Sequence, residues 1–224
     1  MLDGSERWPI ARQPVLIVLT LLALVLGDRG SATPVDPTDD ALRIYAVHVG
    51  GSLYGVYLGR GLIITAAHVV GSSSAPVQIA GLDLPGRVLK KSPFEQQDLA
   101  LLSVDERKLP VSLRLRRMPL CQGRPVVGSA VIVAIPEGTA RSQILSPGAL
   151  PPDVRSQFPT VISHVKSTGN SGSGVFDAEK HCLLGVMSRK IIQRSPSGES
   201  SMDIAKYFVP AYIIREFIPP EYPF

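Results

Sequence analysis

Short apolar runs interrupted by glycine and proline dominate the chain after residue 40 and most constrain its fold. The 20 Gly and 20 Pro among 224 residues favour many turns and short strands over long helices. No helical pattern of 10–15 residues separates the runs, so a parallel α/β sheet is disfavoured. The runs of this first group are RIYAVHVG (43–50), LYGVYLG (53–59), LIIT (62–65), PVQIAG, RVLKKS and LALLSV (99–104).

A second group of strand-length runs follows a basic, proline-containing crossover from Pro110 to Arg124. Two groups of about six strands predict an all-β fold of two antiparallel six-stranded β-barrels, one at about 42–109 and one at about 125–209. A short C-terminal helix is expected at about 210–218, with Pro210 at its first position. The runs of the second group are SAVIVAIP (129–136), TVISHVK (160–166), SGVFD (173–177) and CLLGVMSRK (182–190).

The N-terminus carries one continuous apolar segment, VLIVLTLLALVL (15–26), preceded by Arg7 and Arg12. Twelve residues rise about 18 Å as a helix, against a hydrocarbon core of about 30 Å. Residues 1–32 are therefore interpreted as a signal peptide cleaved after Ala32, or as an uncleaved N-terminal anchor. Residues 33–41 form a polar linker, and the chain is expected to be exported, periplasmic or secreted, or held at the membrane by this segment.

Charge and metal-ligand spacing argue against two other classes of protein. The net charge is +4 and the densest basic group is LRLRRM (113–118), while only 6% of residues are aromatic, so we expect no nucleic-acid partner. The four His and two Cys form no ligand-spaced cluster, so we expect no metal. Cys121 and Cys182 fit one disulfide of an exported protein, the alternative being two buried free thiols.

Three polar residues stand next to apolar strands in the order His68, Asp98 and Ser171, within LIITAAHVVG, EQQDLALLSV and STGNSGSGVF. Acyl transfer by a serine needs a nucleophile, a base that takes its proton and a carboxylate that fixes the tautomer of the base. His68 and Asp98 belong to the first strand group and Ser171 to the second. The site is therefore expected between the two barrels.

The glycines around Ser171 support this interpretation. An oxyanion hole needs backbone N–H groups without side chains in the way, and the N–H groups of Gly169 and Ser171 are two residues apart. Gly172 lets the chain bend directly after the nucleophile. Gly-Asn-Ser-Gly by itself is also a common turn composition, so the argument depends on all three segments together.

TAAH, DLALL and GNSGSG resemble the His, Asp and Ser motifs of the chymotrypsin-like serine peptidases over about residues 42–218. The compact spacing is similar to bacterial HtrA and glutamyl-endopeptidase types, and KYFVPAYIIREF resembles the end of the HtrA protease domain. The resemblance implies that His68 is general base and acid, Asp98 orients it and Ser171 attacks. It implies that Ser188 supports Asp98. Only 53 residues follow Ser171 (224 − 171), so no PDZ domain is expected.

The resemblance also places the pocket for the substrate side chain at Val165 to Thr168 and after Ser188. Lys166, Arg189 and Lys190 in these stretches suit an acidic residue before the cleaved bond; the alternative is that these cations point to solvent. Residues 190–205 are polar and are expected to form a mobile loop. The expected pocket residues are Val165, Lys166, Thr168, Arg189 and Lys190.

The sequence thus predicts a serine endopeptidase that hydrolyses peptide bonds through an acyl-enzyme at Ser171. Its partners are protein or peptide substrates, and it needs no cofactor. The alternative is a catalytically silent peptidase fold that holds a peptide as a binding or scaffolding module. We expect Ser173, which stands beside the nucleophile in GNSGSG, to be dispensable for catalysis.

Overall fold

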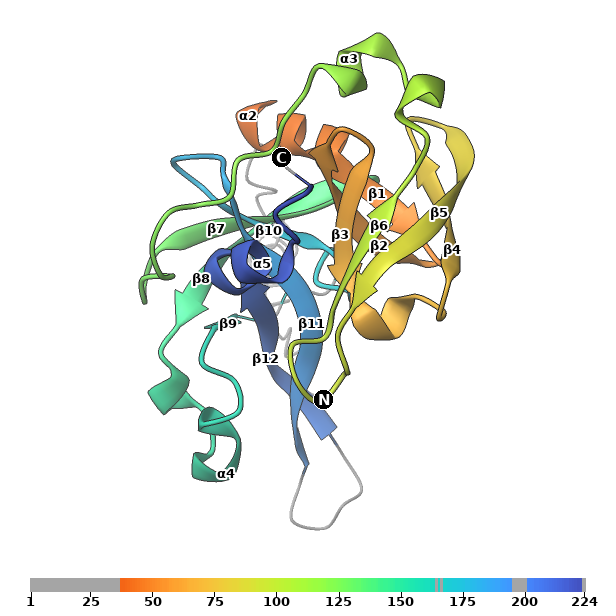
Figure 1. Cartoon of the computed structure of the whole chain (residues 1–224). Helices are drawn as coiled ribbons and strands as arrows, with labels where there is room; N and C mark the ends of the chain where they lie inside the picture. The colour runs from red at the N-terminus through yellow and green to blue at the C-terminus, as the bar shows by residue number, and fades with distance from the viewer. Residues whose placement is uncertain (1–36, 164, 166, 195–200, 223–224) are drawn as a thin grey trace, which may run out of the picture. The chain divides into compact units, whose positions relative to one another are not determined.

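The computed structural model describes residues 37–163, 165, 167–194 and 201–222 (Figure 1). The predicted signal peptide or anchor, the start of the predicted linker and the pocket candidate Lys166 lie outside these residues. None of the helices in the described ranges is long and apolar enough to cross a membrane.

The first group of strands closes into an antiparallel barrel, drawn in orange to yellow-green in Figure 1. Its burial alternates along β4, where every second residue is buried, as expected of a strand with one face on a core. Around the barrel its strands are β1 (Ala46–Val49), β2 (Leu53–Gly59), β3 (Leu62–Ala66), β6 (Leu99–Ser103), β5 (Leu82–Lys91) and β4 (Ser74–Ile79).

The second group closes into another antiparallel barrel, drawn in green to blue. The predicted all-β fold of two six-stranded barrels with a C-terminal helix is therefore confirmed in the described residues. Around this barrel the strands are β7 (Ala130–Ile135), β8 (Gly138–Leu145), β9 (Val161–Ile162), β12 (Ser201–Pro210), β11 (Leu183–Arg194) and β10 (Gly174–Asp177).

An apolar core fills the space between the two barrels. It joins first-barrel residues such as Val56 and Leu99 to second-barrel residues such as Ile132 and Phe176. The C-terminal helix α5 (Ala211–Phe217) adds Ile214 and Phe217 to the same core. Because both barrels bury side chains in one shared core, residues at their facing edges are held in fixed positions.

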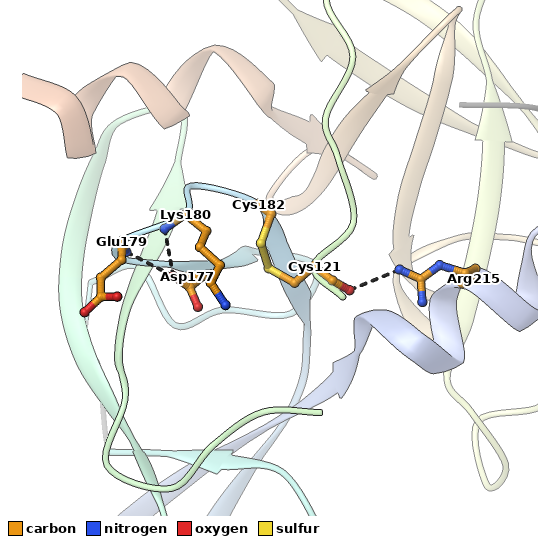
Figure 2. Close-up of a disulfide and its surroundings, with 6 residues drawn as sticks. All are labelled: Cys121, Asp177, Glu179, Lys180, Cys182 and Arg215. Atoms are coloured by element: carbon orange, nitrogen blue, oxygen red, sulfur yellow. Dashed lines mark hydrogen bonds between the residues drawn. A yellow bond between two sulfur atoms is a disulfide. The ribbon is translucent and has the colours of Figure 1, made fainter. Parts of the chain in front are cut away.

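A disulfide between Cys121 and Cys182 ties the crossover to the second barrel (Figure 2). The two Cα atoms are 5.0 Å apart, within the normal range for a bonded pair. Arg215 of α5 donates a hydrogen bond to the Cys121 carbonyl oxygen at 3.0 Å. The crossover, the start of β11 and the C-terminal helix are thus joined at one place.

Short helical turns occupy the connections. The crossover carries α3 (Val111–Arg114), and the connection from β8 to β9 carries α4 (Pro152–Arg155). Part of the segment expected as a linker forms the short helix α2 (Pro37–Asp40). Its Asp39 is buried and accepts two hydrogen bonds from Arg141 of β8, which holds this segment on the second barrel. The 3₁₀ turns are η1 (Ala41–Tyr45), η2 (Ala67–Val69), η3 (Glu106–Lys108) and η4 (Pro147–Ala149).

Three local expectations differ from the structure. The described parts of the polar stretch 190–205 belong to the paired strands β11 and β12, so a loop over this whole stretch is wrong. Strand β8 was not expected, because its sequence GTARSQIL has few apolar residues. Pro210 ends β12 with an extended backbone (φ −76°, ψ 158°) and precedes the helix instead of opening it.

Candidate active site

His68 and Asp98 lie at the same end of two paired strands of the first barrel. The pairing of β3 with β6 sets Ala66 opposite Leu99, His68 follows β3 in the turn η2, and Asp98 directly precedes β6. The Ala67 N–H donates to the Asp98 carbonyl oxygen at 3.0 Å and holds the two segments together. The register of one strand pair therefore accounts for the meeting of these side chains.

The Asp98 carboxylate is almost completely enclosed, with 1% of its side chain exposed, and donors surround it. His68 Nδ1 lies 3.0 Å from Oδ1 and 2.9 Å from Oδ2, and the His68 backbone N–H donates to Oδ1 at 3.1 Å. The Ser188 hydroxyl donates to Oδ2. Two of these donors belong to His68, so the carboxylate fixes both its ring and its backbone.

Ser171 lies in the turn between β9 and β10 of the second barrel, and main-chain bonds to both barrels hold this turn. The Ser171 carbonyl oxygen accepts the Tyr54 N–H of the first barrel at 3.2 Å, and the Gly172 N–H donates to the Met187 carbonyl oxygen at 2.8 Å. Gly172 has φ 86°, and a Cβ atom placed there would overlap the Tyr54 carbonyl oxygen. Only glycine fits this position because the two backbones approach so closely.

The structure brings the three predicted residues together. His68 Nε2 lies 2.8 Å from Ser171 Oγ, so one imidazole links Asp98 and Ser171 through its two nitrogens. Ser171 Oγ has a second acceptor, the Ser188 carbonyl oxygen, at 3.3 Å. The chain Asp98–His68–Ser171 is continuous at hydrogen-bond distance, which is the geometry for proton transfer from a serine hydroxyl.

The turn before Ser171 leaves two backbone donors available. The Thr168 carbonyl oxygen accepts the Asn170 N–H at 3.0 Å. In a trans peptide, C=O and N–H point in opposite directions, so the Gly169 N–H points away from that bond. Within the described part of the chain, neither the Gly169 N–H nor the Ser171 N–H donates to an acceptor. Both are available to a ligand.

The expected pocket residues have different surroundings. Val165 and Thr168 are buried, and the Thr168 hydroxyl oxygen is enclosed without a hydrogen-bond partner in the described ranges. Lys190 is exposed and lies 3.7 Å from an Asp203 carboxylate oxygen. Arg189 turns to the first barrel, where its guanidinium carbon lies 3.8 Å from the centroid of the Phe94 ring.

Two residues that the sequence did not single out complete the site. Phe94 meets the His68 ring edge to face, with ring centroids 5.5 Å apart, and its carbonyl oxygen accepts an N–H from Arg189. Lys206 of β12 is 6% exposed, and burial lowers the pKa of its ammonium. The available signal for Lys206 was a single lysine within the apolar strand IAKYFVP.

The trypsin-like peptidase domain family matches residues 51–186, which is more than half of the chain. The chain therefore belongs to this family of peptidases, and the expected resemblance is confirmed. The matched range includes His68, Asp98 and Ser171.

Solved structures of proteases share the fold at low sequence identity. The protease domain of MamO from Magnetospirillum magneticum is 20% identical, with a TM-score of 0.55 over 80% of this chain and 97% of that one. Rv3671c protease of M. tuberculosis in its inactive form is 18% identical, with a TM-score of 0.56 over 79% and 88%. A serine endoprotease from Yersinia pestis is 17% identical, with a TM-score of 0.55 over 82% and 65%. No curated protein matches the sequence.

Proposed function

We propose that the protein is a serine endopeptidase that hydrolyses peptide bonds through an acyl-enzyme at Ser171. The observation that carries this proposal is the continuous contact from Asp98 through His68 to Ser171 Oγ, at 2.9 Å and 2.8 Å. A serine hydroxyl becomes a strong nucleophile only when a correctly oriented base takes its proton, and this contact supplies that base.

The proposed reaction assigns one role to each residue. His68 Nε2 takes the proton as Ser171 Oγ bonds to the substrate carbonyl carbon. When the C–N bond breaks, the same nitrogen returns the proton to the leaving amine. Water, activated by His68, then hydrolyses the ester and regenerates Ser171. Asp98 holds Nδ1 protonated and stabilises the imidazolium, and Ser188 keeps the carboxylate in place.

The available N–H groups of Gly169 and Ser171 support the second requirement of this chemistry. Negative charge develops on the carbonyl oxygen in the transition state, and backbone donors stabilise it at about 3–4 kcal/mol for each donor. The Thr168 carbonyl oxygen accepts the Asn170 N–H, so it does not occupy the Gly169 or Ser171 N–H groups. We assign them to the oxyanion hole.

Export is part of the proposal. Its support in the described residues is the Cys121–Cys182 disulfide, because disulfides persist in oxidising compartments outside the cytosol. Residues 1–32 would supply the signal peptide or the membrane anchor.

The deciding experiment is labelling of the full 224-residue chain with a fluorophosphonate, followed by peptide mapping of the adduct. We expect one adduct on Ser171, and no adduct in Ser171→Ala or His68→Ala. Circular dichroism spectra matching the wild type would show that the variants are folded. A folded wild-type chain that takes no adduct would contradict the proposal and favour a module that holds peptide without cleaving it.

A further inference from the structure

Lys206 is a buried cation at the end of the second barrel that lies beside Ser171. Its neighbours across the sheet are Ile162 of β9 and Lys190 of β11. Alternate residues of a strand share a face, so Lys206 shares its face with Phe208, which packs in the barrel core with Ile162 and Val165. The lysine side chain is therefore directed into the barrel end and away from the outer surface of β12.

The end of this side chain lies next to the turn that carries the nucleophile. A Cβ atom placed on Gly169 would lie 3.4 Å from Lys206 Cε. Gly169 precedes Ser171 by two residues, a separation of at most about 7 Å along the chain. When a substrate acylates Ser171, the side chain of the acylating residue is attached to the Cα atom next to the carbonyl carbon. The space close to Gly169 and Lys206 is therefore within reach of that side chain.

Within the part of the chain that the structure describes, Lys206 lacks a counter-charge at contact distance. Among the described residues, no hydrogen bond or ion pair involves its ammonium group, and the nearby Asp203 carboxylate contacts Lys190. Burial is the main cause of the lowered pKa of Lys206. Lys190 lowers this pKa further, and Asp203 opposes the shift. A buried cation is costly unless an anion pairs with it, so an arriving carboxylate would be strongly favoured.

A second donor next to Gly169 is also unsatisfied. Thr168 is 3% exposed, and among the described residues its enclosed hydroxyl has no hydrogen-bond partner. Burying such a group without a partner is unfavourable, because nothing replaces the hydrogen bonds it makes to water in the unfolded chain. An ammonium and a hydroxyl on adjoining segments complement the two oxygens of a carboxylate, which accepts charge-assisted hydrogen bonds.

We propose that Lys206 and Thr168 bind the side-chain carboxylate of an aspartate or glutamate on the N-terminal side of the cleaved bond. The assignment rests on the proposed peptidase function and adds its substrate class. It retains Thr168 from the pocket expected from the sequence, but it replaces the cations considered there, which were Lys166, Arg189 and Lys190. Arg189 stacks on Phe94 and Lys190 is exposed beside Asp203, whereas Lys206 is enclosed and lies next to Gly169.

The test compares fluorogenic peptides that differ only at the residue before the cleaved bond, with Glu, Gln, Asp or Leu there. The readout is the ratio of kcat/KM for Glu over Gln within each protein, so that a general change in activity cancels. We expect a ratio of at least about tenfold for the full wild-type chain, because removing the charge leaves a buried cation unpaired.

Variants locate the source of this ratio. Lys206→Met keeps the length of the side chain without its charge and should bring the ratio close to one. Lys206→Arg keeps the charge and should retain most of the ratio, which a merely structural role would not predict. Lys180→Gln removes one positive charge near the disulfide, where Lys180 is exposed (Figure 2), and should leave the ratio unchanged.

Failure of this inference is distinct from failure of the proposed function. A wild-type chain that is labelled at Ser171 but has a ratio near one, or a ratio that survives Lys206→Met, overturns the carboxylate site alone. If Ser171 takes no label, the peptidase proposal fails and the site is tested by binding. Peptides that end in Glu or Gln then serve as probes. If the wild-type chain binds the Glu peptide more tightly than the Gln peptide, and Lys206→Met removes this difference, the carboxylate site is supported. Equal binding of the two peptides by the wild-type chain overturns it.

Discussion

The two barrels contribute unequal halves to the candidate active site. In the half from the first barrel, the Asp98 carboxylate accepts hydrogen bonds from a backbone N–H, a ring nitrogen and a hydroxyl. Both ring nitrogens of His68 lie at hydrogen-bond distance from a partner. In the second half, the Thr168 and Ser173 hydroxyls and Arg189 Nε are enclosed without hydrogen-bond partners, within the described residues. The first half is fully satisfied by the protein itself, and the second half is not.

This difference indicates which half meets the substrate. A group whose task is to hold a base in one orientation works best when all its hydrogen bonds are already made. A group that recognises a ligand must keep a donor unused until the ligand arrives. The unsatisfied Thr168 hydroxyl near Ser171 therefore fits a binding surface, and the satisfied carboxylate of the first barrel fits a fixed part of the reaction machinery.

The largest effect is expected in the satisfied half, for Asp98→Asn. An amide in place of the carboxylate cannot both fix the His68 tautomer and stabilise an imidazolium, so kcat/KM should fall about 10³–10⁴-fold with the fold retained. Steady-state kinetics on a cleaved peptide measures this. Asp105→Asn is the control: Asp105 caps a surface turn and pairs with Arg107, so little change is expected. An Asp98→Asn protein with more than about a tenth of wild-type activity would contradict the comparison.

The next effect concerns the position where the two halves join. Gly172→Ala should lower the free energy of unfolding by more than about 3 kcal/mol, because its methyl group overlaps the Tyr54 carbonyl and its φ is left-handed. Gly81→Ala is the control, since Gly81 also has a left-handed φ of 77° but no atom lies within 4 Å of its added Cβ. It should cost about 1–2 kcal/mol. Urea unfolding of both variants gives the comparison, and equal losses would show that the close approach to Tyr54 is unimportant.

The smallest effect is expected in the unsatisfied half, for Ser173→Ala. The Ser173 side chain is fully buried and its hydroxyl has no partner among the residues that the structure describes, so its removal should raise the free energy of unfolding by up to about 1 kcal/mol. Activity should stay within about threefold of the wild type. Ser188→Ala is the comparison for this variant, because it deletes a hydroxyl that does have a partner, the Asp98 carboxylate. It should lower kcat/KM by about tenfold. If Ser173→Ala is the inactive variant, Ser171 is not the nucleophile.

The residues that the sequence predicted for the reaction are those with a strong local pattern. His68 and Asp98 stand at the ends of continuous apolar strands, and Ser171 stands among glycines, so each is recognisable in a short window. The antiparallel pairing of β3 with β6 then brings the first two together. Strand β8 and the polar ends of the β11–β12 hairpin, residues 191–194 and 201–205, were missed because a polar sequence is ordered there by backbone pairing with neighbouring strands.

Phe94 and Lys206 mark the limit of such reasoning. Phe94 reaches His68 only because the loop before β6 folds back over the imidazole. Alternation within IAKYFVP does not show which face of the strand is buried, and a lysine on a strand is usually solvated. Pairing with β9 and β11 turns Lys206 toward Gly169 and encloses it.

The two-barrel architecture and the three residues assigned to the reaction can be recognised in the amino-acid sequence, because periodicity and short motifs are local properties of the chain. The folded structure is needed to learn which polar groups are enclosed, which are already paired and which cation lies beside the nucleophile. Burial and pairing depend on segments far apart in the chain, such as Lys206 and Gly169, whose contact is set by the closure of the second barrel.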